Sequence, residues 1–125
     1  MIKAVIENKG DTLVTEFPKD YLSIYEELCS IGCRKALERI PLTDNEEDDI
    51  RVKLYSDSNF GIHLLCLFSE ENTLADANTV CNVIEDSDDA IKEELEQNLL
   101  HDQYGDIEEL MSEIKELQEM RLGGM

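Results

Sequence analysis

The spacing of the apolar residues changes near Ser58, and this change limits the fold more than any other feature of the chain. Before it, apolar and polar residues alternate in short runs, the pattern of β-strands that bury one face. After it, apolar residues recur every three or four positions, as in helices that bury one side. The sequence therefore predicts an α+β protein, with a small mixed α/β N-terminal half that contains a β-hairpin and a helical, strongly acidic C-terminal half. We expect an α/β subdomain over residues 1–57 and an acidic helical subdomain over residues 58–125, packed together as one unit.

The N-terminal half is predicted to contain a hairpin, a helix and further strands. The residues "KGD" form the turn between the first two strands, and Pro18 ends the second. A helix follows, with Asp20 as its N-cap and Gly32 as its stop. The apolar stripe of this helix consists of Tyr21, Leu22, Tyr25, Leu28 and Cys29. Because it contains Pro41, the predicted strand over residues 35–42 is expected at the edge of the sheet. The expected strands span residues 2–8, 12–17, 35–42 and 50–55.

Four helices are predicted in the C-terminal half. They cover residues 60–70, 73–86, 87–105 and 106–120. Ser87 followed by acidic residues is typical of a helix start, so we expect it to cap the third of them. The last helix has an apolar stripe at every third or fourth position. This stripe consists of Ile107, Leu110, Met111, Ile114 and Leu117. The final residues, "RLGGM", are expected to be a frayed tail.

The chain is strongly acidic, with 30 Asp and Glu against 11 Lys and Arg and a formal net charge of -19. Between Glu85 and Glu119 there are 14 acidic residues against Lys92 and Lys115, so this stretch carries -12. A charge of this size repels nucleic acids and anionic membranes and attracts basic surfaces. We therefore expect a protein partner with a basic surface, and neither direct nucleic-acid binding nor membrane binding.

The carboxylates of the last predicted helix are spaced along one side. Asp106, Glu109, Glu113 and Glu116 follow one another at intervals of three and four residues. Successive members then lie roughly 4.5 to 6 Å apart along the helix axis. Because the side chains spread outward, the distance between successive carboxylates can approach the separation of phosphates on a DNA strand, about 7 Å. Like charges at this spacing destabilise an isolated helix by a few tenths of a kcal/mol per pair. A solvated acidic face and a binding face both remain open as interpretations.

The sequence contains no pattern that predicts catalysis or a cofactor. His63 and His101 neighbour no Ser or Cys in a nucleophile motif, and there is no glycine-rich phosphate loop. The segment "CSIGC" has C-x3-C spacing and no second Cys/His pair to complete a zinc site. In "TDNEEDD" the glycine and the final glutamate of a calcium loop are replaced by Asp49 and Tyr55. We expect no enzyme, no metal site and no cofactor.

The apolar segments of the chain also bear on its compartment. No N-terminal segment has the basic flank and apolar run of a signal peptide. The longest apolar run, "IHLLCLF", is too short to span a bilayer. We therefore expect a cytoplasmic protein. Reduced, buried thiols are expected at all four cysteines, because they lie mostly within apolar patterns. These are Cys29, Cys33, Cys66 and Cys81.

Three segments of the chain resemble one protein family. A hairpin leads into "FPKDYLSIYEEL", an acidic loop leads into "IRVKLYSDS", and helices close on "SDDAIKEELEQNLLHDQYGDIEELMSEI". This order and spacing resemble the ArdA antirestriction proteins, closest to short acidic versions carried on conjugative elements of Gram-positive bacteria. The most specific pieces are "EFPKDY", "DAIKEELEQNLL" and "GDIEELMSEI". The resemblance covers most of residues 1–120.

The resemblance implies a DNA mimic. In that family, acidic surface groups imitate the phosphates of a duplex and occupy the DNA groove of Type I restriction–modification enzymes. It also implies an elongated body of small domains, often a homodimer. Full-length members that resemble this chain have a further acidic C-terminal domain, which this chain, ending at Met125, lacks, so the length of DNA imitated, the dimer and the target stay open. The implied phosphate mimics are Asp106, Glu109, Glu113, Glu116, Glu93, Glu94 and Glu96.

Other functions are compatible with the same charge pattern. One is inhibition of another DNA-binding defence nuclease, such as a CRISPR effector, because it presents the same basic cleft. Another is a non-enzymatic acidic adaptor that binds a basic partner without competing with DNA. A third is a soluble α+β domain whose charge only keeps it dispersed.

Overall fold

The structure is a computed structural model that describes residues 2–44, 49–101 and 103–123. It is a mixed α/β fold, with a three-stranded antiparallel sheet in the N-terminal half and five α-helices, mostly in the C-terminal half. The strands are β1 (Ile2–Asn8), β2 (Asp11–Phe17) and β3 (Ile50–Tyr55). The helices are α1 (Tyr21–Ser30), the short 3-10 helix η1 (Leu37–Arg39), α2 (Asn59–Leu65), α3 (Leu74–Asp86), α4 (Asp89–Leu100) and α5 (Ile107–Gly123).

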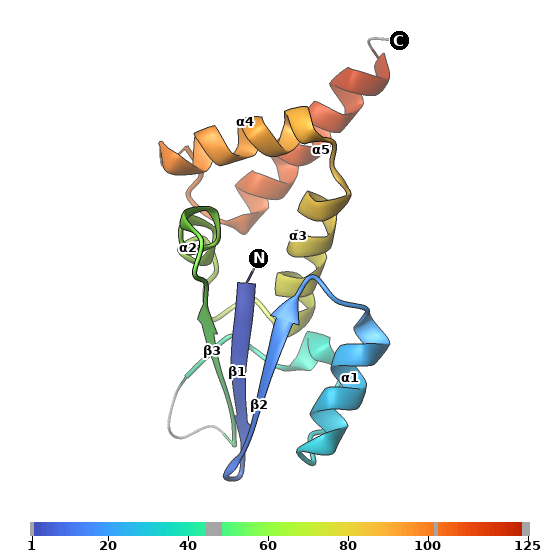
Figure 1. The fold of residues 1–125 in the computed structure, drawn as a ribbon, viewed down its shortest axis with the longest axis vertical. Coiled ribbons are helices and arrows are strands. Elements are labelled where there is room, and N and C mark those ends of the chain that lie inside the picture. The colour runs from blue at the N-terminus through green and yellow to red at the C-terminus, as the bar shows by residue number, and fades with distance from the viewer. Residues whose placement is uncertain (1, 45–48, 102, 124–125) are drawn as a thin grey trace.

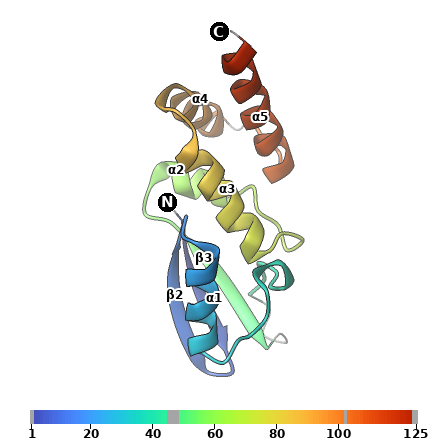
Figure 2. The same ribbon diagram turned by 90° about the vertical axis from the view of Figure 1, so that its right-hand side faces the viewer.

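The molecule is elongated, with its sheet and its last helices at opposite ends. Figures 1 and 2 both show the sheet and α1 at one end, α4 and α5 at the other, and α3 running between them. Helix α5 packs against both α4 and α3, and α4 also contacts α2. The two ends are therefore connected by helix packing as well as by the chain itself.

The sheet is built around β1, which pairs with β2 on one side and with β3 on the other. The predicted hairpin is confirmed, with Ile2 opposite Phe17 and Asn8 opposite Asp11. Its two-residue turn has positive φ at both Lys9 (51°) and Gly10 (92°). Two positive φ angles are characteristic of a type I′ turn, whose twist matches that of the strands it joins. Glycine adopts such an angle without the steric cost that a side chain brings.

Alternate residues of β1 form the centre of the hydrophobic core. Ile2, Ala4 and Ile6 are fully buried, whereas the residues between them are only partly covered. Helices α1 and α3 contact β2, and η1 packs against α3. The buried residues form one cluster that extends from Ile2 in β1 to Ile114 in α5. The same core therefore holds both the sheet and the acidic helices.

Side-chain caps fix the starts of the helices. Asp20 caps α1 as predicted, and its carboxylate accepts the N–H of Ser23. At α3, Thr73 and Asp76 form a reciprocal capping box, with hydrogen bonds of 3.3 and 2.9 Å. Such caps satisfy backbone N–H groups that have no partner within the helix.

The predicted cap of α4 at Ser87 is wrong by one residue. Asp88 caps this helix and accepts the N–H of Ile91 at 3.0 Å. Ser87 is buried at the end of α3, where its hydroxyl donates to the carbonyl of Val83 at 2.8 Å. The hydroxyl of Ser87 is therefore engaged with α3, and the adjacent Asp88 provides the cap of α4.

The predicted strand over residues 35–42 is wrong. This segment forms η1, and beyond it Pro41 pairs with Thr73 in an isolated bridge. The carbonyl of Ile40 accepts the N–H of Leu74 at 2.9 Å. The segment therefore bonds to the start of α3 and does not join the sheet. One contact with the sheet remains, because the N–H of Val52 in β3 donates to the carbonyl of Thr43 at 2.8 Å.

Helix α1 buries a different side from the one predicted. Ile24 and Leu28 face the core, whereas Leu22, assigned to the stripe, is 66% exposed. The pattern starting at Ile24 continues to the buried Ile31, an i, i+4, i+7 spacing that fits the helix better. The predicted stripe shared only Leu28 with the fully buried residues of this helix.

Two further expectations are corrected at the surface. The final helix continues through Gly123, so most of the expected tail is helical. Cys66 is exposed, although Cys33 and Cys81 are buried as predicted and Cys29 is partly buried. All four cysteines are free thiols. Residues 45–48 of the predicted acidic loop and the last two residues of the tail lie outside the described residues.

Helix length and composition bear on membrane insertion. Among the described residues, none of the helices combines the length and apolar character needed to cross a bilayer.

The packing of α4 gives a direct test of the core. Leu95 is fully buried, whereas Leu100 of the same helix is 41% exposed. We expect Leu95→Ala to lower the free energy of unfolding by about 2–5 kcal/mol, because it leaves a cavity among packed side chains. The matched Leu100→Ala change should stay within about 0.5 kcal/mol of the parent. Urea denaturation followed by circular dichroism measures both, and equal losses would contradict the assigned orientation of α4.

Candidate functional site

The acidic charge of the chain is unevenly divided between its two halves. Residues 1–57 contain 13 acidic and 8 basic residues, a net charge of -5. Residues 58–125 contain 17 acidic and 3 basic residues, a net charge of -14. Figure 1 shows α4 and α5, which carry most of the second group, together at one end of the molecule. This end is the candidate site.

The first two carboxylates of the predicted row organise the start of α5. Asp106 precedes the helix, and its carboxylate accepts the N–H of Glu109 at 2.9 Å. The carboxylate of Glu109 turns back and accepts the N–H of Gly105 at 2.8 Å. The arrangement resembles a capping box, shifted by one residue because Glu109 bonds to the residue before the cap. Both carboxylates are exposed but held in place by the backbone.

Glu113 joins α5 to α4 through a side-chain network. It is partly buried, and one of its oxygens accepts the side-chain N–H of Asn98 at 2.8 Å. The same Asn98 amide group also donates to the hydroxyl of Tyr104 at 3.1 Å. Burial raises the pKa of Tyr104 from 10.0 to about 12, and the negative charges of Glu113 and Glu94 add to the rise. The carboxylate of Glu94 on α4 therefore lies near the same network.

The four carboxylates of the predicted row do come together. Asp106, Glu109, Glu113 and Glu116 all line one shallow, open pocket of about 560 Å³, together with Tyr104. Glu116 is exposed and, among the described residues, makes no hydrogen bond or ion pair. The row thus contains three carboxylates with structural bonds and one without.

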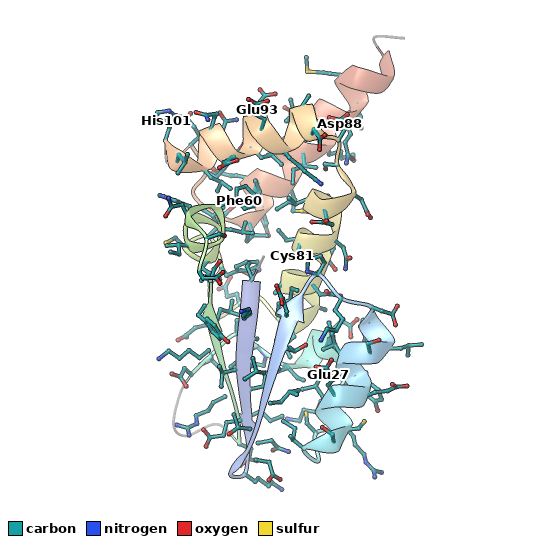
Figure 3. The ribbon with its side chains drawn as sticks, viewed as in Figure 1. Glu27, Phe60, Cys81, Asp88, Glu93 and His101 are labelled. Atoms are coloured by element: carbon teal, nitrogen blue, oxygen red, sulfur yellow. The ribbon has the colours of Figure 1, made fainter. Side chains whose placement is uncertain are left out.

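The three predicted carboxylates of α4 do not form a second row. All three are exposed. Because each residue of a helix turns by about 100°, Glu94 and Glu96 point to nearly opposite sides of α4. In Figure 3, Glu93 points away from the body of the molecule. Only Glu94 is therefore placed near the carboxylates of α5.

Sequence reasoning missed the two polar residues that organise this surface. Asn98 follows Leu95 by three residues and precedes Leu99, so it lies beside the apolar stripe of α4. A polar residue at that position indicates a buried hydrogen bond. Tyr104 lies in the short connection between the helices and is almost completely buried. Its pairing with Asn98 depends on the fold and has no local sequence pattern.

Across the described ranges, no three His, Cys, Asp or Glu side chains are grouped closely enough to hold a metal ion.

No protein-family model matches the chain, and neither a curated protein nor a solved structure shows significant similarity to it. The relationship to the ArdA family therefore stays a prediction from the sequence.

The raised pKa of Tyr104 predicts a specific weakness at alkaline pH. The folded chain retains this proton where the unfolded chain, with a pKa of 10.0, releases it. Stability from this group is therefore complete below about pH 10 and is lost as the pH rises toward about 12. Tyr104→Phe should lose less stability across this interval than the parent, measured as the urea midpoint. A Tyr55→Phe control at an exposed site should behave like the parent, and the assignment is wrong if Tyr104→Phe does too.

Proposed function

We propose that this chain is a DNA-mimic inhibitor that occupies the DNA-binding cleft of a Type I restriction–modification enzyme, an antirestriction function. The observation that carries the proposal is the gathering of Asp106, Glu109, Glu113 and Glu116 around one surface at the acidic end of the molecule. The enzyme's Lys and Arg side chains would contact these carboxylates in place of phosphates. No catalytic step by this chain is involved.

The charge density of the row is comparable to that of a DNA strand. Ten residues separate Asp106 from Glu116, which corresponds to about 15 Å along α5. Over the same length of axis, one strand of B-DNA carries about four phosphates, at roughly 3.4 Å each. Four carboxylates over this distance match the number of charges that a cleft for DNA would meet.

The hydrogen bonds of the row favour binding because they restrict the conformations of the carboxylate side chains before a partner binds. Gly105 and the N–H of Glu109 hold the first two carboxylates, and Asn98 holds Glu113. Side chains that are ordered before association lose less conformational entropy when they bind. Glu94 extends the same charged surface onto α4.

Electrostatic replacement of phosphates has a measurable consequence. A cleft that releases counterions when it binds DNA also releases them when it binds a carboxylate surface. Affinity should therefore fall steeply as the salt concentration rises. The direct test is cleavage of unmodified DNA by a Type I restriction enzyme, with the purified protein titrated in at two salt concentrations. Dose-dependent protection that weakens at the higher salt supports the proposal.

A quadruple amide variant tests the site. Asp106→Asn, Glu109→Gln, Glu113→Gln and Glu116→Gln remove four charges. At the first three positions the amide keeps an oxygen that can accept the existing hydrogen bond. At about 0.5 kcal/mol per lost contact, roughly 2 kcal/mol of binding free energy disappears. This corresponds to an increase of roughly 30-fold in the concentration that gives half protection.

A matched control removes the same charge from the rest of the surface. The residues Asp11, Glu26, Asp57 and Glu70 are all exposed and lie outside α4 and α5. Their Asn and Gln replacements should leave protection within about twofold of the parent. Equal weakening by both variants would mean that total charge matters and the row does not. If the parent gives no protection at either salt, the restriction target is wrong. The alternatives are then another DNA-binding defence nuclease, or a basic protein that this chain binds as an acidic adaptor.

A further inference from the structure

A second pocket lies at the opposite end of the molecule from the acidic helices. It has a volume of about 420 Å³ and is formed where the hairpin turn, the segment after α1 and the start of β3 meet. In Figure 1 these three segments lie together at the lower end of the view, with α4 and α5 at the upper end. The charged and amide side chains that line it are Asn8, Lys9, Asp11, Arg34, Lys35 and Asp49.

Three of the chain's 11 Lys and Arg residues border this pocket. Lys9, Arg34 and Lys35 are exposed, and none of them forms an ion pair within the part of the chain that the structure describes. Two other cations pair with carboxylates: Lys19 with Glu27 at 2.7 Å, and Arg51 with Glu7 at 2.6 Å. With Asp11 and Asp49, the lining has three cations against two carboxylates, a net charge of +1 in a chain of net charge -19.

The backbone beneath these cations is well organised. Asn8 is only 7% exposed, and its side-chain amide donates to the carbonyl of Ile31 at 2.7 Å. This bond fixes the end of α1 against the end of β1. Gly32 then turns the chain with φ of 78°, and the N–H of Cys33 bonds back to Leu28 at 3.0 Å. Arg34 and Lys35 therefore directly follow a hydrogen-bonded turn, and Lys9 is one of the two residues of the hairpin turn.

The chemistry of the lining selects an oxyanion. A guanidinium such as that of Arg34 offers a planar pair of N–H donors to phosphate or carboxylate, and the two ammonium groups add positive charge. Asp11 and Asp49 repel a bare anion, but their oxygens accept hydrogen bonds from hydroxyl groups. A volume of about 420 Å³ is in the range of small-molecule sites and exceeds the size of a single phosphate ion.

We propose that this pocket binds a phosphate ester that also carries hydroxyl groups, such as a sugar phosphate. Lys9, Arg34 and Lys35 hold the phosphate, and Asp11 and Asp49 accept hydrogen bonds from the hydroxyl groups. The site shares no residue with the acidic row on α5, so a test of this proposal is independent of the DNA-mimic function.

The test uses three probes on the full chain: inorganic phosphate, ribose 5-phosphate and ribose. Binding is followed by the amide NMR signals of Gly10 and Gly32, which lie beside the pocket. We expect saturable shifts with both phosphates, a dissociation constant at least tenfold lower for ribose 5-phosphate than for inorganic phosphate, and no saturable shift with ribose.

Two pairs of substitutions locate the site. Arg34→Gln with Lys35→Gln should weaken ribose 5-phosphate binding at least tenfold. The control pair Arg39→Gln with Lys53→Gln makes the same change in net charge at exposed positions outside the pocket and should change binding less than twofold. Retained dispersion of the amide spectrum shows that each variant is folded. Equal weakening by both pairs would overturn the pocket as the site.

A third pair tests the role of the two carboxylates. Asp11→Ala with Asp49→Ala removes both the repulsion and the hydrogen-bond acceptors, so inorganic phosphate should bind more tightly, while the preference for ribose 5-phosphate over phosphate should shrink. If the parent binds both phosphates equally, the hydroxyl-bearing ligand is wrong. If neither phosphate gives a saturable shift, the anion site itself is wrong.

Discussion

Burial of the alternate residues of β1 is the interaction on which the rest of the structure depends. Ile2, Ala4 and Ile6 lie at the centre of the only sheet among the described residues and belong to the same core cluster as Ile114 of the last helix. A net charge of -19 opposes compaction through self-repulsion, so a continuous apolar core has to offset it. Because each element contributes one apolar side to this core, its charged residues face outward. The acidic surface is thus a product of the same pattern that folds the chain.

Part of the acidic charge also stabilises the structure that displays it. Asp20, Asp88 and Asp106 each stand at the start of a helix, where a carboxylate satisfies backbone N–H groups and interacts favourably with the helix dipole. Glu113 bridges α4 and α5 through Asn98. Several carboxylates therefore have two roles, because they carry surface charge and also hold the fold. Substitution by amides separates the two roles better than substitution by alanine, because only the charge is lost.

Sequence patterns predicted the elements whose residues interact locally. The hairpin, β3 and the four C-terminal helices follow from alternation, turn residues and helical spacing, and their existence and type are confirmed. The ends of two helices are wrong, because α2 ends at Leu65 and α4 at Leu100, each five residues before the predicted end. Two other failures were decided by partners distant in the sequence: residues 35–42 pair with the start of α3, and the buried side of α1 is set by what it packs on. Another is local, because the hydroxyl of Ser87 bonds to Val83 of α3 and Asp88 caps α4 in its place. The row on α5 was predictable because its spacing is local, whereas the network of Tyr104, Asn98 and Glu113 joins three separate segments.

The separation of charge along the long axis also determines how the molecule turns in an electric field. Residues 58–125, which include α4 and α5 at one end, carry a net charge of -14, and residues 1–57, which include the sheet at the other end, carry -5. A body charged in this way experiences a torque near a basic surface, so α4 and α5 turn toward that surface before contact. The hairpin turn then points away from the partner into solvent. The molecule can therefore dock by one end while the opposite end, with its cation-lined hollow, stays open to small solutes.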